Sequence, residues 1–153
     1  MLFRSVPLPM ALLTLSGING TLDMSTNGAT KAVSSNITFA SGPFGNTNGS
    51  FFFRGDENSY VELTNNGQLD ARFSIGVFAW VRLHNTSGPI YKHVPEHYGF
   101  SFRVVHSTLG VRVRFMERRT FKSYRLYKKK VLEAHAWCFI GTTYDYQDRK
   151  SVV

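Results

Sequence analysis

The residues best suited to chemistry in this chain are the basic side chains of one segment, 103–130. That segment holds ten Lys and Arg residues and one acid, Glu117, whereas residues 1–102 hold six basic and six acidic side chains. The net charge of +8 is therefore a local property. Such a patch attracts polyanions, and salt screens the attraction. The predicted binding residues are Arg112, Arg114, Arg118, Arg119, Lys122, Arg125, Lys128, Lys129 and Lys130.

Three interpretations of this basic segment compete. It binds a sulfated glycan or an acidic protein, it is a solvated positive face without a partner, or it binds nucleic acid. Nucleic-acid binding would use aromatic side chains on which bases stack. The aromatic residues of the segment are Phe115, Phe121, Tyr124 and Tyr127, and most of them fall on positions expected to face the core. We therefore predict no nucleic-acid partner.

Catalytic chemistry finds little support in the acidic residues. Retaining glycosidases need two carboxyl groups about 5 Å apart. No expected strand carries acids at alternate positions, since Glu62, Glu117 and Glu133 are isolated and Asp56-Glu57 lies in an expected loop. The sequence predicts a protein that is not an enzyme and has no catalytic residue.

Two short motifs suggest other sites. His93-Val94-Pro95-Glu96-His97 resembles a zinc-protease fragment, but Pro95 prevents the helix that would align ligands at i and i+4. We expect a polar loop there and no metal site. Arg54-Gly55-Asp56 is an integrin-type tripeptide, which could present a guanidinium and a carboxylate at a loop tip. The competing interpretation is an ordinary turn at Gly55.

Four sequons, at Asn19, Asn36, Asn48 and Asn85, predict N-glycosylation and favour an extracellular protein, whereas a lone cysteine favours an intracellular one. The single cysteine, Cys138, excludes a disulfide within the chain and lies in an apolar run, so we expect a buried, inert thiol. No apolar run reaches 18 residues, which predicts no membrane insertion. Residues 1–35 are interpreted either as an N-terminal strand and loop or as a weak signal-like segment.

The basic side chains are expected to lie on β-strands. The chain is rich in aromatic residues, with thirteen Phe, seven Tyr and two Trp, and its apolar residues alternate with polar ones rather than follow a helical period. In 99–105 the residues Phe100, Phe102 and Val104 share one face, and in 109–115 Arg112 and Arg114 oppose the apolar residues. Further strands are expected at 36–39, 121–127 and 136–144, the last of the chain. Strands at this spacing predict an all-β, two-sheet sandwich.

Residues 55–83 are expected to form a core hairpin. The alternating stretch 59–63 and the stretch 73–81 flank a turn signal at Asn65-Asn66-Gly67. The strand 51–53 is expected to pair with 60–63.

The hairpin segment also resembles a known family. Its "SYVEL" and "SIGVFAWV" strands, together with "WCFIGTTYDY" at 137–146, resemble the concanavalin A-like lectin/glucanase superfamily in its laminin G-like branch. The resemblance covers most of residues 36–146. It implies an antiparallel jelly-roll sandwich over 36–153. Family members continue past the "TYD" strand with further strands, so the jelly roll is expected to be incomplete at the C-terminus.

The resemblance implies an extracellular binding or adhesion module. Laminin G-like modules use basic patches for sulfated glycans and glycosylated receptors, so a sulfated glycan or an acidic glycoprotein is the expected partner. Calcium is a further family possibility, with candidate ligands Asp56, Glu57, Asn58, Asp70 and Asp145, but none shows a calcium-loop spacing. We predict no cofactor. The alternative is a purely structural module of a larger multidomain receptor or matrix protein.

Overall fold

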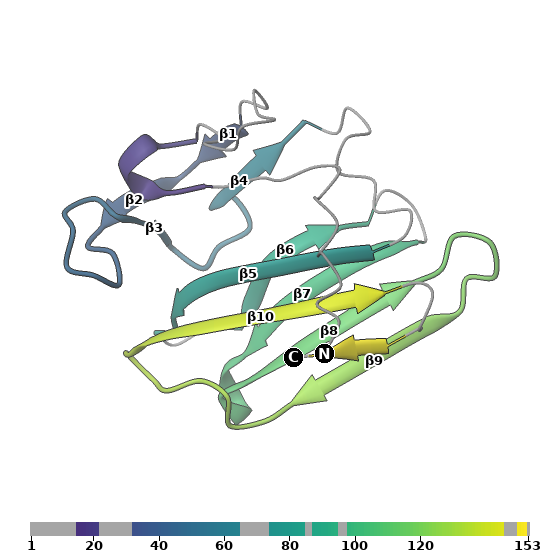
Figure 1. Cartoon of the computed structure of the whole chain (residues 1–153). Coiled ribbons are helices and arrows are strands. Elements are labelled where there is room, and N and C mark those ends of the chain that lie inside the picture. The colour runs from purple at the N-terminus through teal and green to yellow at the C-terminus, as the bar shows by residue number, and fades with distance from the viewer. Residues whose placement is uncertain are drawn as a thin grey trace, which may run out of the picture. The chain divides into compact units, whose positions relative to one another are not determined.

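The structure is a computed structural model that describes residues 15–21, 32–64, 74–84, 87–94, 98–145 and 150–152. Its elements are strands and two short 3₁₀ helices, and the strand pairs are antiparallel (Figure 1). The prediction of an all-β protein is confirmed. The chain divides into two compact units, residues 1–70 and residues 71–153.

The first unit contains η1 (Gly17–Asn19) and two separate strand pairs. β1 (Ala32–Ser35) pairs with β4 (Tyr60–Leu63), and β2 (Ile37–Ala40) pairs with β3 (Ser50–Phe53). The expected pairing of 51–53 with 60–63 is therefore wrong. Asn36 explains the difference, because its φ of 47° bends the chain between β1 and β2 and lets each strand take its own partner.

The second unit contains two sheets. The four-stranded sheet has the order β6-β7-β8-β9, and the three-stranded sheet has the order β11-β10-β5. Its strands are β5 (Ser74–Arg82), β6 (Gly88–His93), β7 (Gly99–Val105), β8 (Gly110–Met116), β9 (Ser123–Lys128), β10 (Trp137–Asp145) and β11 (Lys150–Val152). The second 3₁₀ helix, η2 (His106–Thr108), connects β7 to β8.

Two expectations about these strands are wrong. β5 is not the hairpin partner of β4, because β4 belongs to a separate two-stranded sheet with β1 and β5 pairs with β10, from Arg82↔Trp137 to Ser74↔Asp145. The strand at 136–144 is not the last, because β11 follows it and pairs with β10. Local alternation identified β4 and β5 as strands but carries no information on partners that are distant in sequence. The turn signal at 65–67 and most of the signal-like stretch lie outside the described residues.

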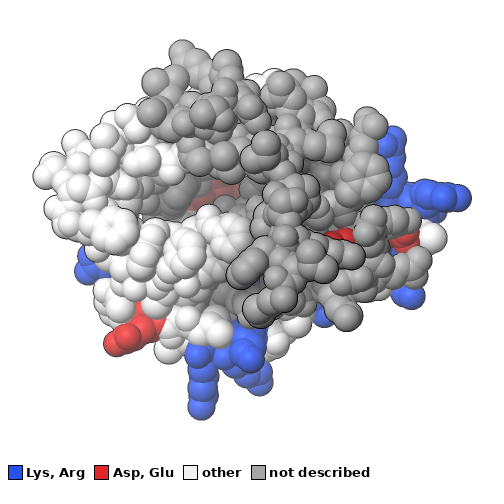
Figure 2. Space-filling view, viewed as in Figure 1, with Lys and Arg blue, Asp and Glu red and all other residues white. Residues whose placement is uncertain are grey.

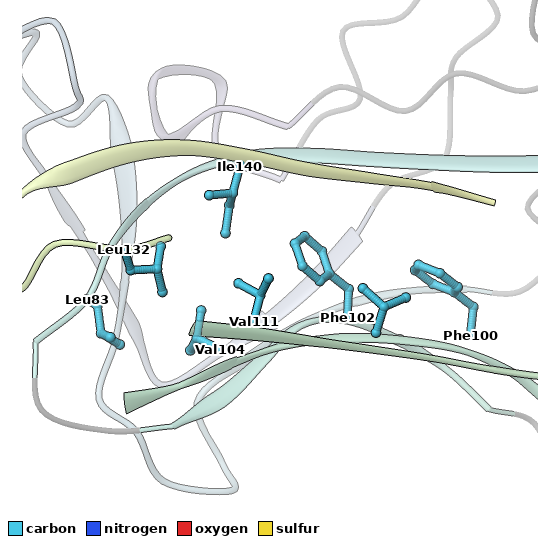
Figure 3. Packing of buried hydrophobic residues seen from close by; sticks show 8 residues of the cluster. Leu83, Phe100, Phe102, Val104, Val111, Leu132 and Ile140 are labelled. Carbon is cyan, nitrogen blue, oxygen red and sulfur yellow. The ribbon is translucent and has the colours of Figure 1, made fainter. Parts of the chain in front are cut away.

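The core of the second unit lies between its two sheets, as in a sandwich. Phe102 and Val111 are fully buried, and Figure 3 shows Ile140 of β10 directed toward them from the opposite sheet. Phe100, Phe102 and Val104 are all buried, which confirms the predicted face of β7. Burial of one such side chain contributes about 1.5–3 kcal/mol. The alternate residues of β7 and β8 must therefore point away from the core.

One glycine is required where β6 turns into β7. Gly99 has a φ of +126°, and a Cβ on it would lie 2.0 Å from the carbonyl oxygen of His93. Only glycine tolerates both the conformation and the close approach. Gly99 therefore sets the start of β7 and with it the register of the residues that follow.

Candidate functional site: an arginine face on the four-stranded sheet

Four arginines lie together on the outer face of the four-stranded sheet. Arg103 of β7 is directly opposite Arg112 of β8, and Arg114 of β8 is directly opposite Arg125 of β9. All four are exposed, because the intervening positions on these strands fill the core. We call Arg103, Arg112, Arg114 and Arg125 the arginine face.

The arginine face borders an open groove of about 740 Å³. Besides the four arginines, its lining includes a further cation, two tyrosines and small or apolar residues: Pro89, Lys92, Val94, Tyr98, Gly99, Ser101, Met116, Leu126 and Tyr127. The groove crosses all four strands of one sheet. Its extent across the sheet therefore suits an extended ligand.

The two arginine pairs are electrostatically unfavourable by themselves. Like charges directly opposite each other on neighbouring strands destabilise a sheet. In the described part of the chain, no carboxylate forms an ion pair with any of the four guanidinium groups. The guanidinium of Arg112 lies 5.5 Å from the ring centroid of Tyr127, and Nε of Arg114 donates to Oγ of Ser123 at 3.2 Å. Neither of these two contacts brings a negative charge to the face.

The other predicted cations lie at the two ends of the sheet. Arg118, Arg119 and Lys122 belong to the β8–β9 turn, where Arg118 lies over the ring of Tyr98 and Lys122 over that of Tyr124. Lys128, Lys129 and Lys130 lie at the opposite end of β9, and five residue steps of a strand span about 17 Å. The nine predicted residues therefore form a central group of three with a basic cluster at each end.

Individual lysines at the far end differ in placement. Lys128 is paired with Val111, which faces the core. Lys128 is exposed, but it therefore does not belong to the arginine face. Lys129 reaches the outer side, since its Nζ lies 5.9 Å from the ring centroid of Tyr127. Lys130 occupies a turn with φ of 56°.

Arg103 belongs to the face but was absent from the predicted binding residues. The signal for it was present in the sequence, because Phe100, Phe102 and Val104 were recognised as one buried face. Strand alternation then places Ser101 and Arg103 on the other face. What the sequence lacked was the register that sets Arg103 beside Arg112.

The expectation that the aromatic residues of the basic segment mostly face the core is only half correct. Phe115 is half-buried and stacks on Tyr144 with ring centroids 4.0 Å apart, and Tyr124 is also half-buried. Phe121 is 58% exposed and Tyr127 is 38% exposed. Tyr127 lies on the outer side because it pairs with Arg112 in the register of β8 and β9. An exposed aromatic ring therefore adjoins the arginine face.

The integrin-type tripeptide occupies an exposed turn in the first unit. Gly55 has a φ of +86°. The carboxylate of Asp56 accepts hydrogen bonds from the Asn58 backbone N–H at 2.9 Å and from Nδ2 of Asn36 at 3.2 Å. One carboxylate oxygen thus stabilises the turn, and the other joins the turn to the bend at Asn36.

The described sequons are accessible. Asn19, Asn36 and Asn48 are exposed, although the amide of Asn36 is engaged with Asp56, and Asn85 lies outside the described residues. Cys138 is half-buried rather than fully buried. It packs against the core cluster, and its Sγ accepts a hydrogen bond from the Glu133 backbone N–H at 3.4 Å.

The described residues contain no group of three or more His, Cys, Asp or Glu side chains that could hold a metal ion. His93 ends β6 and Asp145 ends β10, whereas residues 95–97 and Asp70 lie outside the described part. No described helix is long and apolar enough to cross a membrane.

Positive charge is unevenly distributed over the visible surface. In Figure 2 the Lys and Arg atoms project at the left, lower and right margins, whereas the described surface facing the viewer is mostly uncharged. Comparisons with protein-family models, with curated proteins and with solved structures found no match to this chain. The laminin G-like resemblance therefore stays a prediction, and a functional argument depends on the arginine face.

Proposed function

We propose that this chain is an extracellular binding module that recognises a sulfated glycan or an acidic glycoprotein through the arginine face. The observation that carries the proposal is that two arginine pairs stand directly opposite each other in the strand register, Arg103↔Arg112 and Arg114↔Arg125, and line one groove. A fold tolerates such a locally unfavourable arrangement where function requires it. We also propose that the sandwich is a jelly roll of the laminin G-like type.

The chemistry of arginine supports a ligand with oxoanion groups. A guanidinium presents donors in a planar fork that matches sulfate, phosphate and carboxylate oxygens, and these charge-assisted hydrogen bonds are about twice as strong as neutral ones. The groove is lined by residues of all four strands, so its length suits a chain of anionic groups. The sequons at Asn19, Asn36 and Asn48 support an extracellular ligand.

The proposal is tested by chromatography of the full chain on immobilised heparin. Arg112→Ala/Arg114→Ala removes two charges from the face, and Arg54→Ala/Arg82→Ala removes two exposed charges outside the basic segment as a matched control. The wild type is expected to elute with steep salt dependence. The face variant should elute at clearly lower salt than the control variant, with unchanged circular dichroism.

Equal elution of the face variant and the control would reject the proposal, because charge alone would then explain retention. Elution of the wild type below about 0.2 M salt would favour the structural module without a ligand. Stronger retention on single-stranded DNA than on heparin would instead indicate that the arginine face binds nucleic acid, with Tyr127 as the side chain on which a base stacks.

A further inference from the structure

We infer that the arginine face contains two separate oxoanion subsites and selects ligands that carry at least two sulfate groups. This inference rests on the proposed function and specifies the class of glycan. The first subsite is formed by Arg103 and Arg112 across β7 and β8. The second is formed by Arg114 and Arg125 across β8 and β9.

The register of the strands sets the distance between the subsites. Neighbouring strands lie about 4.8 Å apart, and residues two positions apart on a strand are separated by about 6.8 Å. The second pair is displaced by one strand and by two residues from the first. The two pair centres are therefore about 8 Å apart on a line oblique to the strands.

Each pair has the same internal composition. One guanidinium is oriented by a neighbour, Arg112 by the Tyr127 ring and Arg114 by the Ser123 hydroxyl. The other guanidinium, of Arg103 or Arg125, has no hydrogen bond, ion pair or ring contact in the described part of the chain. Each pair thus combines an oriented donor with a donor available to close on a ligand.

A sulfate between the two guanidinium groups of a pair accepts hydrogen bonds from both and removes their mutual repulsion. One such group satisfies only one pair. A ligand with two sulfates about 8 Å apart satisfies both, and its second contact is intramolecular, which multiplies affinity without any new type of contact. Selection therefore favours a saccharide sulfated on two units over a monosulfated one.

The test uses full-length protein, two probes and two single variants. The probes are N-acetylglucosamine 6-sulfate and a heparin-derived tetrasaccharide. Arg103→Gln removes one member of the first pair and Arg125→Gln one member of the second, and neither side chain makes a described contact that folding depends on. Arg54→Gln is the control for loss of an exposed charge outside the subsites and outside the basic segment.

Affinity is measured by calorimetry and site occupancy by NMR of the arginine Nε–H signals. For the tetrasaccharide, Arg103→Gln or Arg125→Gln should raise the dissociation constant at least about tenfold, whereas the control variant should raise it less than about threefold. The monosulfated probe should shift the Arg112 and Arg114 signals of the wild type independently. Arg103→Gln should abolish only the Arg112 shift, and Arg125→Gln only the Arg114 shift.

Either of two results would overturn the inference. A single variant that abolishes both shifts together indicates one merged site. A tetrasaccharide that binds no more tightly than the monosulfated probe removes the case for two subsites. After either result, the proposed function would still hold if retention on heparin depends on Arg112 and Arg114. Loss of that dependence would instead reject the proposed function itself.

Discussion

Arg103→Gln should make the protein more stable while it weakens ligand binding. In the unliganded protein Arg103 faces Arg112 directly, and Arg114 lies diagonally across the same two strands. Removing the charge of Arg103 removes these repulsions, and no described hydrogen bond or ring contact is lost with it. The variant therefore separates the stability of the sheet from the function of its outer face.

The magnitude follows from the pairing. Two unit charges about 7 Å apart in water repel by roughly 0.6 kcal/mol. Cross-strand pairs contribute about 0.2–1 kcal/mol by mutational comparison, which agrees with that value. We therefore expect a gain of about 0.5 kcal/mol in the free energy of unfolding. For a unit of this size the gain raises Tm by about 2–4 °C.

Thermal denaturation followed by circular dichroism at several salt concentrations is the appropriate assay. The difference in Tm should be largest at low salt and should disappear near 1 M NaCl, where the Debye length is about 3 Å. Arg103→Lys keeps the charge and should leave Tm unchanged. Arg119 lies in the β8–β9 turn and has no cross-strand partner in the described sheet. Arg119→Gln should therefore change Tm less than Arg103→Gln does.

Two results would refute this reasoning. A gain in Tm that persists at 1 M NaCl would show that charge repulsion is not its cause. A lower Tm in Arg103→Gln would show that the arginine stem contributes more through packing than its charge costs through repulsion.

Two further predictions concern the core of the second unit. Thr142 is 1% exposed and its Oγ1 has no hydrogen-bond partner in the described part, so Thr142→Val should stabilise the protein by about 1 kcal/mol, seen as a higher urea midpoint at unchanged m. A lower midpoint would mean that the hydroxyl is satisfied in solution. Phe102 is fully buried, so Phe102→Ala should cost about 3–5 kcal/mol in the same assay, whereas Phe121→Ala at an exposed ring should change stability by under about 0.5 kcal/mol. Equal effects of the two would contradict the described core.

The strands of the second unit were largely readable from the sequence. β7 was predicted with its exact bounds, and the alternation around Val111 and Val113 correctly set Arg112 and Arg114 on the outer side. A buried face with period two leaves a clear local signal, because a slip of one residue would expose every apolar side chain. The opposite orientation of Tyr127 was missed because β9 carries aromatic residues on both faces.

Strand partners were not readable in the same way. The stretch from Gly55 to Leu83 was expected to be one hairpin, but β4 pairs with β1 and β5 pairs with β10. The two strands belong to different compact units. Pairing depends on how sheets bury their apolar faces against distant segments, and a local turn signal does not encode that choice.

The sequence by itself determined that this protein is all-β and that its positive charge is concentrated in residues 103–130, because composition and alternation are local properties. Only the tertiary structure decided which of those cations act together. The register of β7, β8 and β9 adds Arg103 to the arginine face and places Lys128 in a row of residues that otherwise face the core. It also separates the cations of the β8–β9 turn and those at the end of β9 from the four arginines. Register is fixed when the two sheets close over Phe102, Val111 and Ile140, so the arginine face is a consequence of the core beneath it.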